Sequence, residues 1–204
     1  KVKFHPTLSR VFTTGHTACF EGLREARELF KQGVTRCLVT GVDSLVNTPS
    51  LLWLDRSFRL KTPANHDGVI PGEAAGVVML EANPVADTSA EVAGLGFARE
   101  KAGILSDQPL LGLGLTEATR NALSEARLGL AEIDGRLSDV TGETYGFKEL
   151  PLVESRLMRV VRKQEQPLWH WADSIGDTGA AAGVAQLILA QQSLKKNYSP
   201  GDNW

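Results

Sequence analysis

The spacing of apolar and polar residues in the first 42 positions predicts a strand, a helix and a second strand. A helix is predicted over residues 17–32, because apolar side chains recur every three or four positions and charged ones occupy the other side. Gly33 ends it, and a short strand precedes it at residues 9–14. The continuous apolar run of residues 37–42 predicts a strand of a parallel sheet covered on both faces, with Cys37 in the core.

The same alternation continues to the end of the chain. Residues 47–71 are rich in turn formers and are predicted to be mostly loop, leading into a strand at residues 77–81. The later predicted elements are a strand at residues 91–99, a helix at 116–128, a strand at 138–141, a helix at 151–162, a strand at 168–171 and a helix after Asp177. Strands that alternate with helices in this way predict an α/β fold.

One short segment occurs twice. Residues 15–22 read GHTACFEG and residues 176–183 read GDTGAAAG, and each opens a helical pattern. The repeat predicts a duplicated fold. A helix start without bulky side chains can be approached closely, and its first N–H groups, which have no partner within the helix, favour negative charge. Two such helix starts facing each other would form a pocket. The alternative interpretation is that both segments are ordinary capped turns.

Composition narrows the possible functions. With 42% hydrophobic and 23% charged residues among 204, the chain is typical of a globular protein. Pro84 and small polar residues at positions 83–89 predict a boundary between two halves, residues 1–84 and 85–204. The net charge of -2, with Lys and Arg scattered among acids, does not indicate a nucleic-acid surface. The longest apolar stretch, residues 180–190, is too short to span a membrane.

The two cysteines give no sign of a disulfide framework. Cys19 and Cys37 lack the spacing of a zinc site, so no metal or cofactor is predicted and the protein is expected in the reducing cytoplasm. The chain begins at Lys1 with neither Met nor a signal-like run, so we expect an upstream portion to be missing.

A longer motif resembles a known family. Residues 66–81, HDGVIPGEAAGVVMLE, resemble the Asp-Gly-Phe-x-x-Gly-Glu-Gly-Ala-Gly stretch of β-ketoacyl synthases of the thiolase-like superfamily. Residues 33–44 resemble the family's helix end and following strand, residues 176–183 its Gly-His-x-x-Gly-Ala-Ala-Gly motif and, more weakly, residues 139–146 its Ala-His-Gly-Thr-x-Thr loop. The resemblance implies a duplicated, layered α-β-α-β-α fold. It also implies that the chain lacks part of the N-terminal half and the last strands.

The family's chemistry is decarboxylative condensation, in which a Cys thiolate carries an acyl group and two His stabilise developing negative charge. The resemblance places the nucleophile at His16, the two His at Thr141 and Asp177, and a Lys at Ala172. All four positions are substituted. An ionised Asp177 would oppose a negative transition state, so the resemblance implies a protein without condensing activity.

Two catalytic alternatives remain open from the sequence. Residues 17–19 spell the family's Thr-Ala-Cys, so Cys19 is an alternative nucleophile for an active 3-oxoacyl-(acyl carrier protein) synthase or acyltransferase. Its other interpretation is a small apolar side chain packed in the first turn of a helix. A hydrolase is the second alternative, with His16, Thr141 and Asp177 in one pocket and Glu143 close by. Otherwise Asp177 caps its helix and Thr141 bonds locally.

The resemblance also implies partners. The family forms dimers through the segment that corresponds to residues 9–30, so we expect a homodimer or a heterodimer with a ketosynthase. Two non-catalytic roles follow. The chain could pair with an active synthase as a chain length factor does, or it could be an accessory protein that holds a cargo. The second role is an analogy with ketosynthase-like proteins that occur alongside type VI secretion effectors. Acyl carrier protein and acyl-CoA are the expected ligands.

Overall fold

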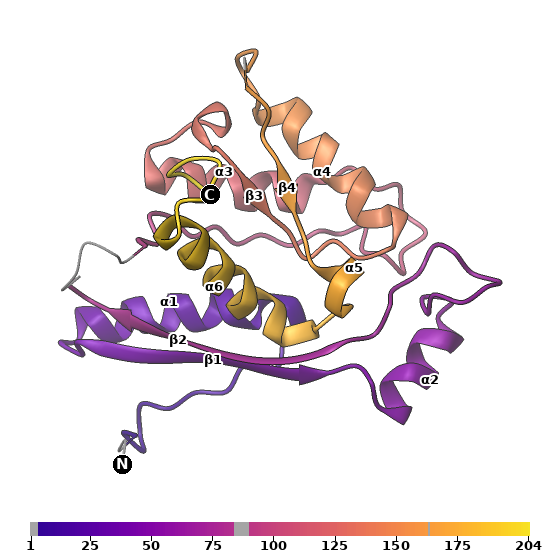
Figure 1. Cartoon of the computed structure of the whole chain (residues 1–204), viewed down its shortest axis with the longest axis horizontal. Coiled ribbons are helices and arrows are strands. Elements are labelled where there is room, and N and C mark those ends of the chain that lie inside the picture. Colours follow the sequence, from indigo (N-terminus) through magenta and orange to yellow (C-terminus); the bar gives the residue numbers. More distant parts are fainter. Residues whose placement is uncertain (1–3, 84–89, 163) are drawn as a thin grey trace.

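The computed structural model describes residues 4–83, 90–162 and 164–204, and its elements are arranged in layers (Figure 1). Helices α1 (Ala18–Lys31) and α6 (Ala182–Lys195) lie side by side on one face of a sheet made of β1 (Arg36–Ser44) and β2 (Glu73–Glu81). On the other side of these helices lie β3 (Arg136–Leu137), β4 (Leu168–Trp169), α3 (Leu113–Ala126) and α4 (Thr144–Leu157). The mixed α/β class predicted from the sequence is confirmed.

A hydrophobic core forms where α1, α6 and β1 meet. Buried Cys19, Leu23, Val39 and Val184 make one cluster there. The helix predicted over residues 17–32 is confirmed as α1, because its amphipathic pattern matches a helix with one face on a sheet. The turn at Gly33 has a φ of +91°, which a glycine adopts without strain.

The prediction of a parallel sheet covered on both faces is wrong. β1 pairs with β2 in an antiparallel ladder, in which Gly41 lies opposite Gly76. Alternate side chains of β1 and β2 therefore point away from α1 and α6. Cys37 is half-buried and lies outside the core cluster. The apolar run looked buried on both faces because its outward side chains are apolar as well: Leu38, Val42, Val77 and Met79 are exposed.

A helix interrupts the segment predicted to be loop. α2 (Thr48–Arg56) starts after Asn47, whose side-chain Oδ1 accepts a hydrogen bond from the backbone N–H of Ser50 at 3.0 Å. Pro49 lies in its first turn. Thr, Pro and Ser read as turn formers in the sequence, but after an Asn they are also the residues with which helices begin.

Two predicted strands are not strands in the described residues. Residues 9–14 and 91–99 have no ladder partner. In the second of these segments Gly94 and Gly96 press so closely on α3 that a Cβ at either would collide with carbonyl oxygens of that helix. The predicted boundary at residues 83–89 lies, apart from Asn83, outside the described residues.

Three elements after residue 100 begin at lower residue numbers than predicted. α3 and α4 start before the predicted positions 116 and 151, and the predicted strand at 138–141 is replaced by β3. Pro151, the first residue of the predicted helix, lies inside α4. A short helix α5 (Ala172–Ile175) follows β4, which pairs with β3 in parallel. None of the helices in the described residues combines the length and the apolar surface that crossing a membrane requires.

Candidate functional site

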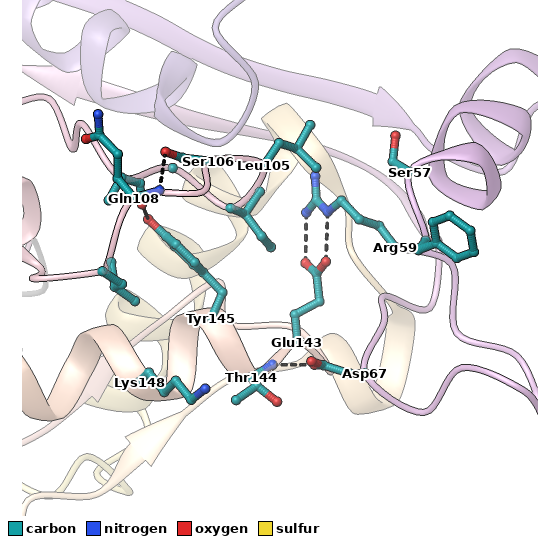
Figure 2. Close-up of a pocket in the computed structure, with 15 residues that line it drawn as sticks. Ser57, Arg59, Asp67, Leu105, Ser106, Gln108, Glu143, Thr144, Tyr145 and Lys148 are labelled. Atoms are coloured by element: carbon teal, nitrogen blue, oxygen red, sulfur yellow. Dashed lines mark hydrogen bonds and ion pairs between the residues drawn. The ribbon is translucent and has the colours of Figure 1, made fainter.

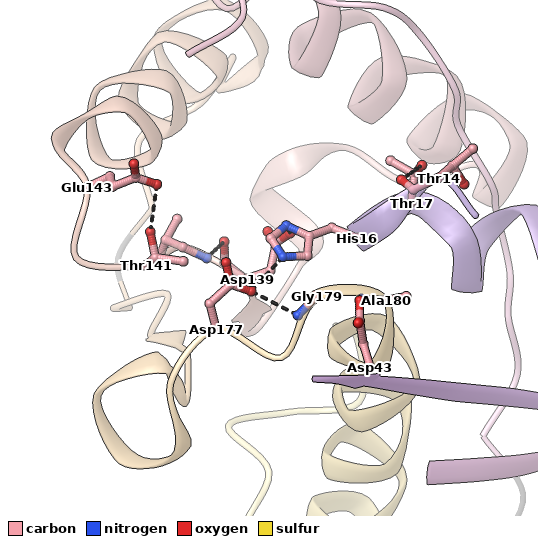
Figure 3. Close-up of polar contacts among 12 residues, drawn as sticks. Thr14, His16, Thr17, Asp43, Asp139, Thr141, Glu143, Asp177, Gly179 and Ala180 are labelled. Carbon is pink, nitrogen blue, oxygen red and sulfur yellow. Dashed lines mark hydrogen bonds and ion pairs between the residues drawn. The ribbon is translucent and has the colours of Figure 1, made fainter. Parts of the chain in front are cut away.

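The two repeated segments meet at the starts of α1 and α6. His16 lies in a turn of 3-10 helix, Gly15–Thr17, that leads into α1, and Asp177 comes just before the corresponding turn, Gly179–Ala181, that leads into α6. Nε2 of His16 lies 2.7 Å from Oδ1 of Asp177 (Figure 3). The structure thus joins residues that the sequence analysis took from the two copies of the repeat.

A second carboxylate holds the other ring nitrogen of His16. Nδ1 lies 3.0 Å from Oδ2 of Asp139, in the loop after β3. Burial opposes the charged form of the imidazole, but hydrogen bonds to Asp139 and Asp177 and their negative charges outweigh it and raise the pKa of His16 to about 10. With carboxylates on both nitrogens, both nitrogens donate. His16 is therefore an imidazolium at neutral pH.

Asp177 is an ionised carboxylate in a mostly buried position. Its side chain is 7% exposed. Burial opposes its charge, but His16 and the backbone N–H of Gly179, which donates to Oδ1 at 2.9 Å, lower the pKa of Asp177. The side chain thus ties the turn before α6 to His16.

The 66–81 motif fixes the backbone of Asp177. The N–H of Asp177 donates to the carbonyl of Ile70 at 2.7 Å, and the N–H of Gly72 donates to the carbonyl of Asp177 at 2.8 Å. These contacts need a glycine at position 72, because a Cβ there would collide with the carbonyl oxygen of Ile175. Backbone groups of the 66–81 motif therefore hold Asp177 in position.

Thr141 contacts a different partner. Its Oγ1 donates to Oε2 of Glu143 at 3.2 Å. Glu143 in turn accepts two hydrogen bonds from Arg59, 2.7 Å from Nε and 2.8 Å from Nη2 (Figure 2). The hydroxyl of Thr141 and the imidazole of His16 have no hydrogen bond between them in the described residues. The contacts therefore do not form a relay of hydroxyl, imidazole and carboxylate.

Asp67 of the motif contacts the start of α4. Its Oδ1 accepts a hydrogen bond from the backbone N–H of Thr144 at 2.6 Å, at the start of α4 (Figure 2). A carboxylate is favourable at that place, because the first N–H groups of a helix carry partial positive charge. The same turn thus orients Glu143, the residue just before α4.

Cys19 is packed inside the molecule. It is the second residue of α1, it is 4% exposed, and its side chain lies so close to α6 that a Cβ at Gly183 would crowd it. Burial raises the pKa of the thiol to about 11, so the thiol is neutral at pH 7. Ala172, the position to which the resemblance assigns a Lys, begins α5. Among the described residues, no group of three or more His, Cys, Asp or Glu side chains is placed to hold a metal ion.

Sequence reasoning missed Asp139 and Arg59. Arg59 lies 84 positions before Glu143 and belongs to a segment that was predicted to be loop. In the sequence, Asp139 lies in the predicted strand 138–141 and begins a loop that resembles the family only weakly. Neither position carries a local sequence signal for its partner, because both ion pairs depend on how distant segments pack.

No protein-family model matches the chain, and no curated protein matches its sequence. Solved structures do match it. A ketosynthase domain of oxazolomycin synthesis from Streptomyces albus is 21% identical, with a TM-score of 0.76 over 92% of this chain and 36% of that one. The chain has a ketosynthase-type, thiolase-like fold.

Two further structures support the same fold. A ketosynthase from Xenorhabdus doucetiae, in complex with its chain length factor, is 22% identical, with a TM-score of 0.75 over 91% of this chain and 46% of that one. A β-ketoacyl synthase from Burkholderia phymatum is 19% identical, with a TM-score of 0.71 over 91% and 48%. This chain therefore spans about a third to a half of the length of the ketosynthases it matches.

Proposed function

We propose that this chain is a ketosynthase-like binding or scaffold subunit without condensing activity. The observation that carries the proposal is the placement of His16 as a fixed cation between Asp139 and Asp177, at the position that the resemblance assigns to a cysteine nucleophile. As part of the same proposal, residues 1–84 and 85–204 are the two halves of the duplicated fold.

The first argument concerns the nucleophile. An imidazole attacks a thioester, or removes a proton, through a ring nitrogen with a free lone pair. Both nitrogens of His16 donate to carboxylates, and its pKa of about 10 keeps it protonated at pH 7. His16 is therefore unsuited to act as a nucleophile or as a general base.

The second argument concerns charge. Loss of carbon dioxide from a malonyl-type thioester produces an enolate, which needs hydrogen-bond donors at its oxygen. The side chains at the family's two His positions are Thr141, whose hydroxyl donates to Glu143, and the ionised Asp177. The single cation of His16 is shared between Asp139 and Asp177, so the group keeps a net negative charge that repels a substrate carboxylate or an enolate and opposes the condensing reaction.

The comparisons support a partner role. One solved relative is a ketosynthase in complex with its chain length factor, and another is a ketosynthase in complex with an acyl carrier protein. By analogy, this chain would pair with a ketosynthase, or with a second copy, through residues 9–30 and bind an acyl carrier protein or acyl-CoA. Residues 9–14 are mostly exposed and have no strand partner in the described residues, which suits an interface. The relatives named here give no support to a role beside secretion effectors.

The proposal is tested by intact-mass analysis after incubation with acyl-CoA and acyl-carrier thioesters. We expect no acyl adduct and intact thioesters. A stoichiometric adduct that disappears in Cys19→Ala but remains in Cys37→Ala would overturn the proposal and establish an acyl-transfer enzyme. Hydrolysis of the thioesters without an adduct, abolished in His16→Gln, would overturn it in favour of a hydrolase.

A further inference from the structure

A cavity of about 790 Å³ extends from His16 between α3, α4 and β3. This volume lies in the range of small-molecule sites. Its walls are largely apolar and include Leu95, Phe97, Leu115, Leu123, Leu150 and Val153. Such a cavity suits a ligand with an apolar body.

Acidic side chains outnumber basic ones around this cavity. Five acidic and three basic side chains line it. Every basic side chain already has an acidic partner in the lining. The pairs are Arg59 with Glu143, Arg136 with Glu154, and His16 with Asp139. The two acids left over are Glu100 and Glu149.

Glu100 is firmly ionised. The N–H of Gly114, in the first turn of α3, donates to its Oε2 at 2.8 Å, and the N–H of Ala102 donates to its Oε1 at 3.1 Å. These backbone hydrogen bonds lower the pKa of Glu100, although it is a carboxyl beside an apolar cavity. Glu100 therefore contributes a fixed negative charge to this wall.

Glu149 lies on α4, one turn after Tyr145. Burial and the negative charges of Glu100 and Asp139 raise the pKa of Glu149, and no basic side chain of the described residues lies within ion-pair distance of it. The hydroxyl of Tyr145 is already committed, because it donates to the carbonyl of Ala102 at 3.0 Å (Figure 2). This end of the cavity thus has negative charge without a counter-charge.

We infer that the cavity binds a cationic amphiphile, with an ammonium group against Glu149 and Glu100 and an alkyl or ring body between α3 and α4. A cation there supplies the missing counter-charge, and the apolar body is removed from water. A fatty carboxylate of the same size would meet the same two acids and be repelled. The inference rests on the proposed non-catalytic role and assigns this cavity a ligand other than the acyl thioesters that the family resemblance implies.

Calorimetric titration of the intact chain at pH 7 with octylamine, octanol and octanoate tests this assignment. Octylamine is protonated at that pH, as the lysine side chain is. We expect it to bind on the order of tenfold more tightly than octanol, and octanoate to bind more weakly than either. Trp204 lines the cavity, so a change in tryptophan fluorescence gives a second signal for the same event.

Two variants locate the site. In Glu149→Gln we expect the affinity for octylamine to fall to that for octanol. The matched control, Glu117→Gln, removes the same charge from the exposed side of α3 and should keep the preference. Ala122→Phe places a larger side chain in the cavity and should weaken the binding of both octylamine and octanol. Circular dichroism of each variant shows whether it is folded.

Several results would overturn the inference: no binding of octylamine, equal affinity for amine and alcohol, tighter binding of octanoate, or a preference that folded Glu149→Gln retains. All of them leave the thioester measurements unaffected. Those measurements test the proposed non-catalytic role separately.

Discussion

His16 and Asp177 are 161 positions apart in the chain, yet their side chains meet at 2.7 Å. Together with Asp139, the pair connects the start of α1 to two segments of the second half. About a third of the His16 side chain stays exposed (35%), so water screens these pairs and their contribution to stability is moderate.

Replacing His16 by glutamine should destabilise the fold. His16→Gln removes the positive charge and leaves the mostly buried Asp177 without its counter-charge. We expect the free energy of unfolding in urea to fall by about 1–3 kcal/mol. The control is His66→Gln, since His66 is exposed and its change should have almost no effect. Equal losses in the two variants would contradict a stabilising role for His16.

The same residue predicts a pH dependence. The folded-state pKa of His16, about 10, is above its ordinary value of 6.5. The folded protein therefore binds more protons than the unfolded chain between these pH values, and stability must fall as pH rises there. The contribution of His16 is complete below pH 6.5 and is lost as pH passes through about 10.

Urea unfolding at pH 6.5 and pH 10 measures this effect. The loss of stability on going to pH 10 should be clearly larger for the native sequence than for His16→Gln. Parallel losses in both proteins would assign the pH dependence to other groups. Below about pH 3.8, the ordinary pKa of an aspartate, the sign reverses, because the pKa of Asp177 is lowered in the folded protein and the unfolded chain binds that proton first.

At the scale of elements, the turn of residues 70–72 and the segment 175–177 support each other. Gly72→Ala places a methyl group against the carbonyl oxygen of Ile175. One or both segments must then shift, with a cost of about 1–3 kcal/mol. Thermal unfolding compared with Gly103→Ala checks this, because a Cβ at Gly103 meets no atom within 4 Å. If Gly72→Ala is as stable as the control, the close approach does not limit this turn.

Local signals predicted some elements and not others. α1 has one buried face and charges on the other, so its periodicity alone identifies it. The partner of β1 was not predictable in this way, because an apolar run looks the same in a parallel sheet and in an antiparallel pair of strands with an open apolar face. The repeat of residues 15–22 and 176–183 identified His16 and Asp177. Asp139 joins them only through tertiary packing.

At the scale of the whole molecule, the second half is fixed to the first by polar contacts as well as by the core. Arg27 on α1 bonds to Glu125 on α3, and Asp67 bonds to the start of α4. Residues 9–14 take no part in a strand ladder within the described residues. Their backbone groups, which have no ladder partner there, can pair with another chain, as those of edge strands do.

Self-association through residues 9–14 is the prediction at this scale. We expect sedimentation velocity to show a dimer that dissociates on dilution. Val11 is 88% exposed, so Val11→Glu should leave the monomer folded and place a charge in the interface, which raises the dimer dissociation constant by about tenfold or more. Val161→Glu is the control, since Val161 is 95% exposed and lies far along the chain in the loop after α4.

The outcomes separate three arrangements. A dimer weakened only by Val11→Glu supports association of two copies through this segment. A dimer that both variants leave intact would place the interface elsewhere, with the exposed apolar face of β1 and β2 as the next surface to test. A chain that stays monomeric alone, but sediments with an added ketosynthase unless Val11 is replaced, would show that the segment serves a heterodimer, as expected of a partner like a chain length factor.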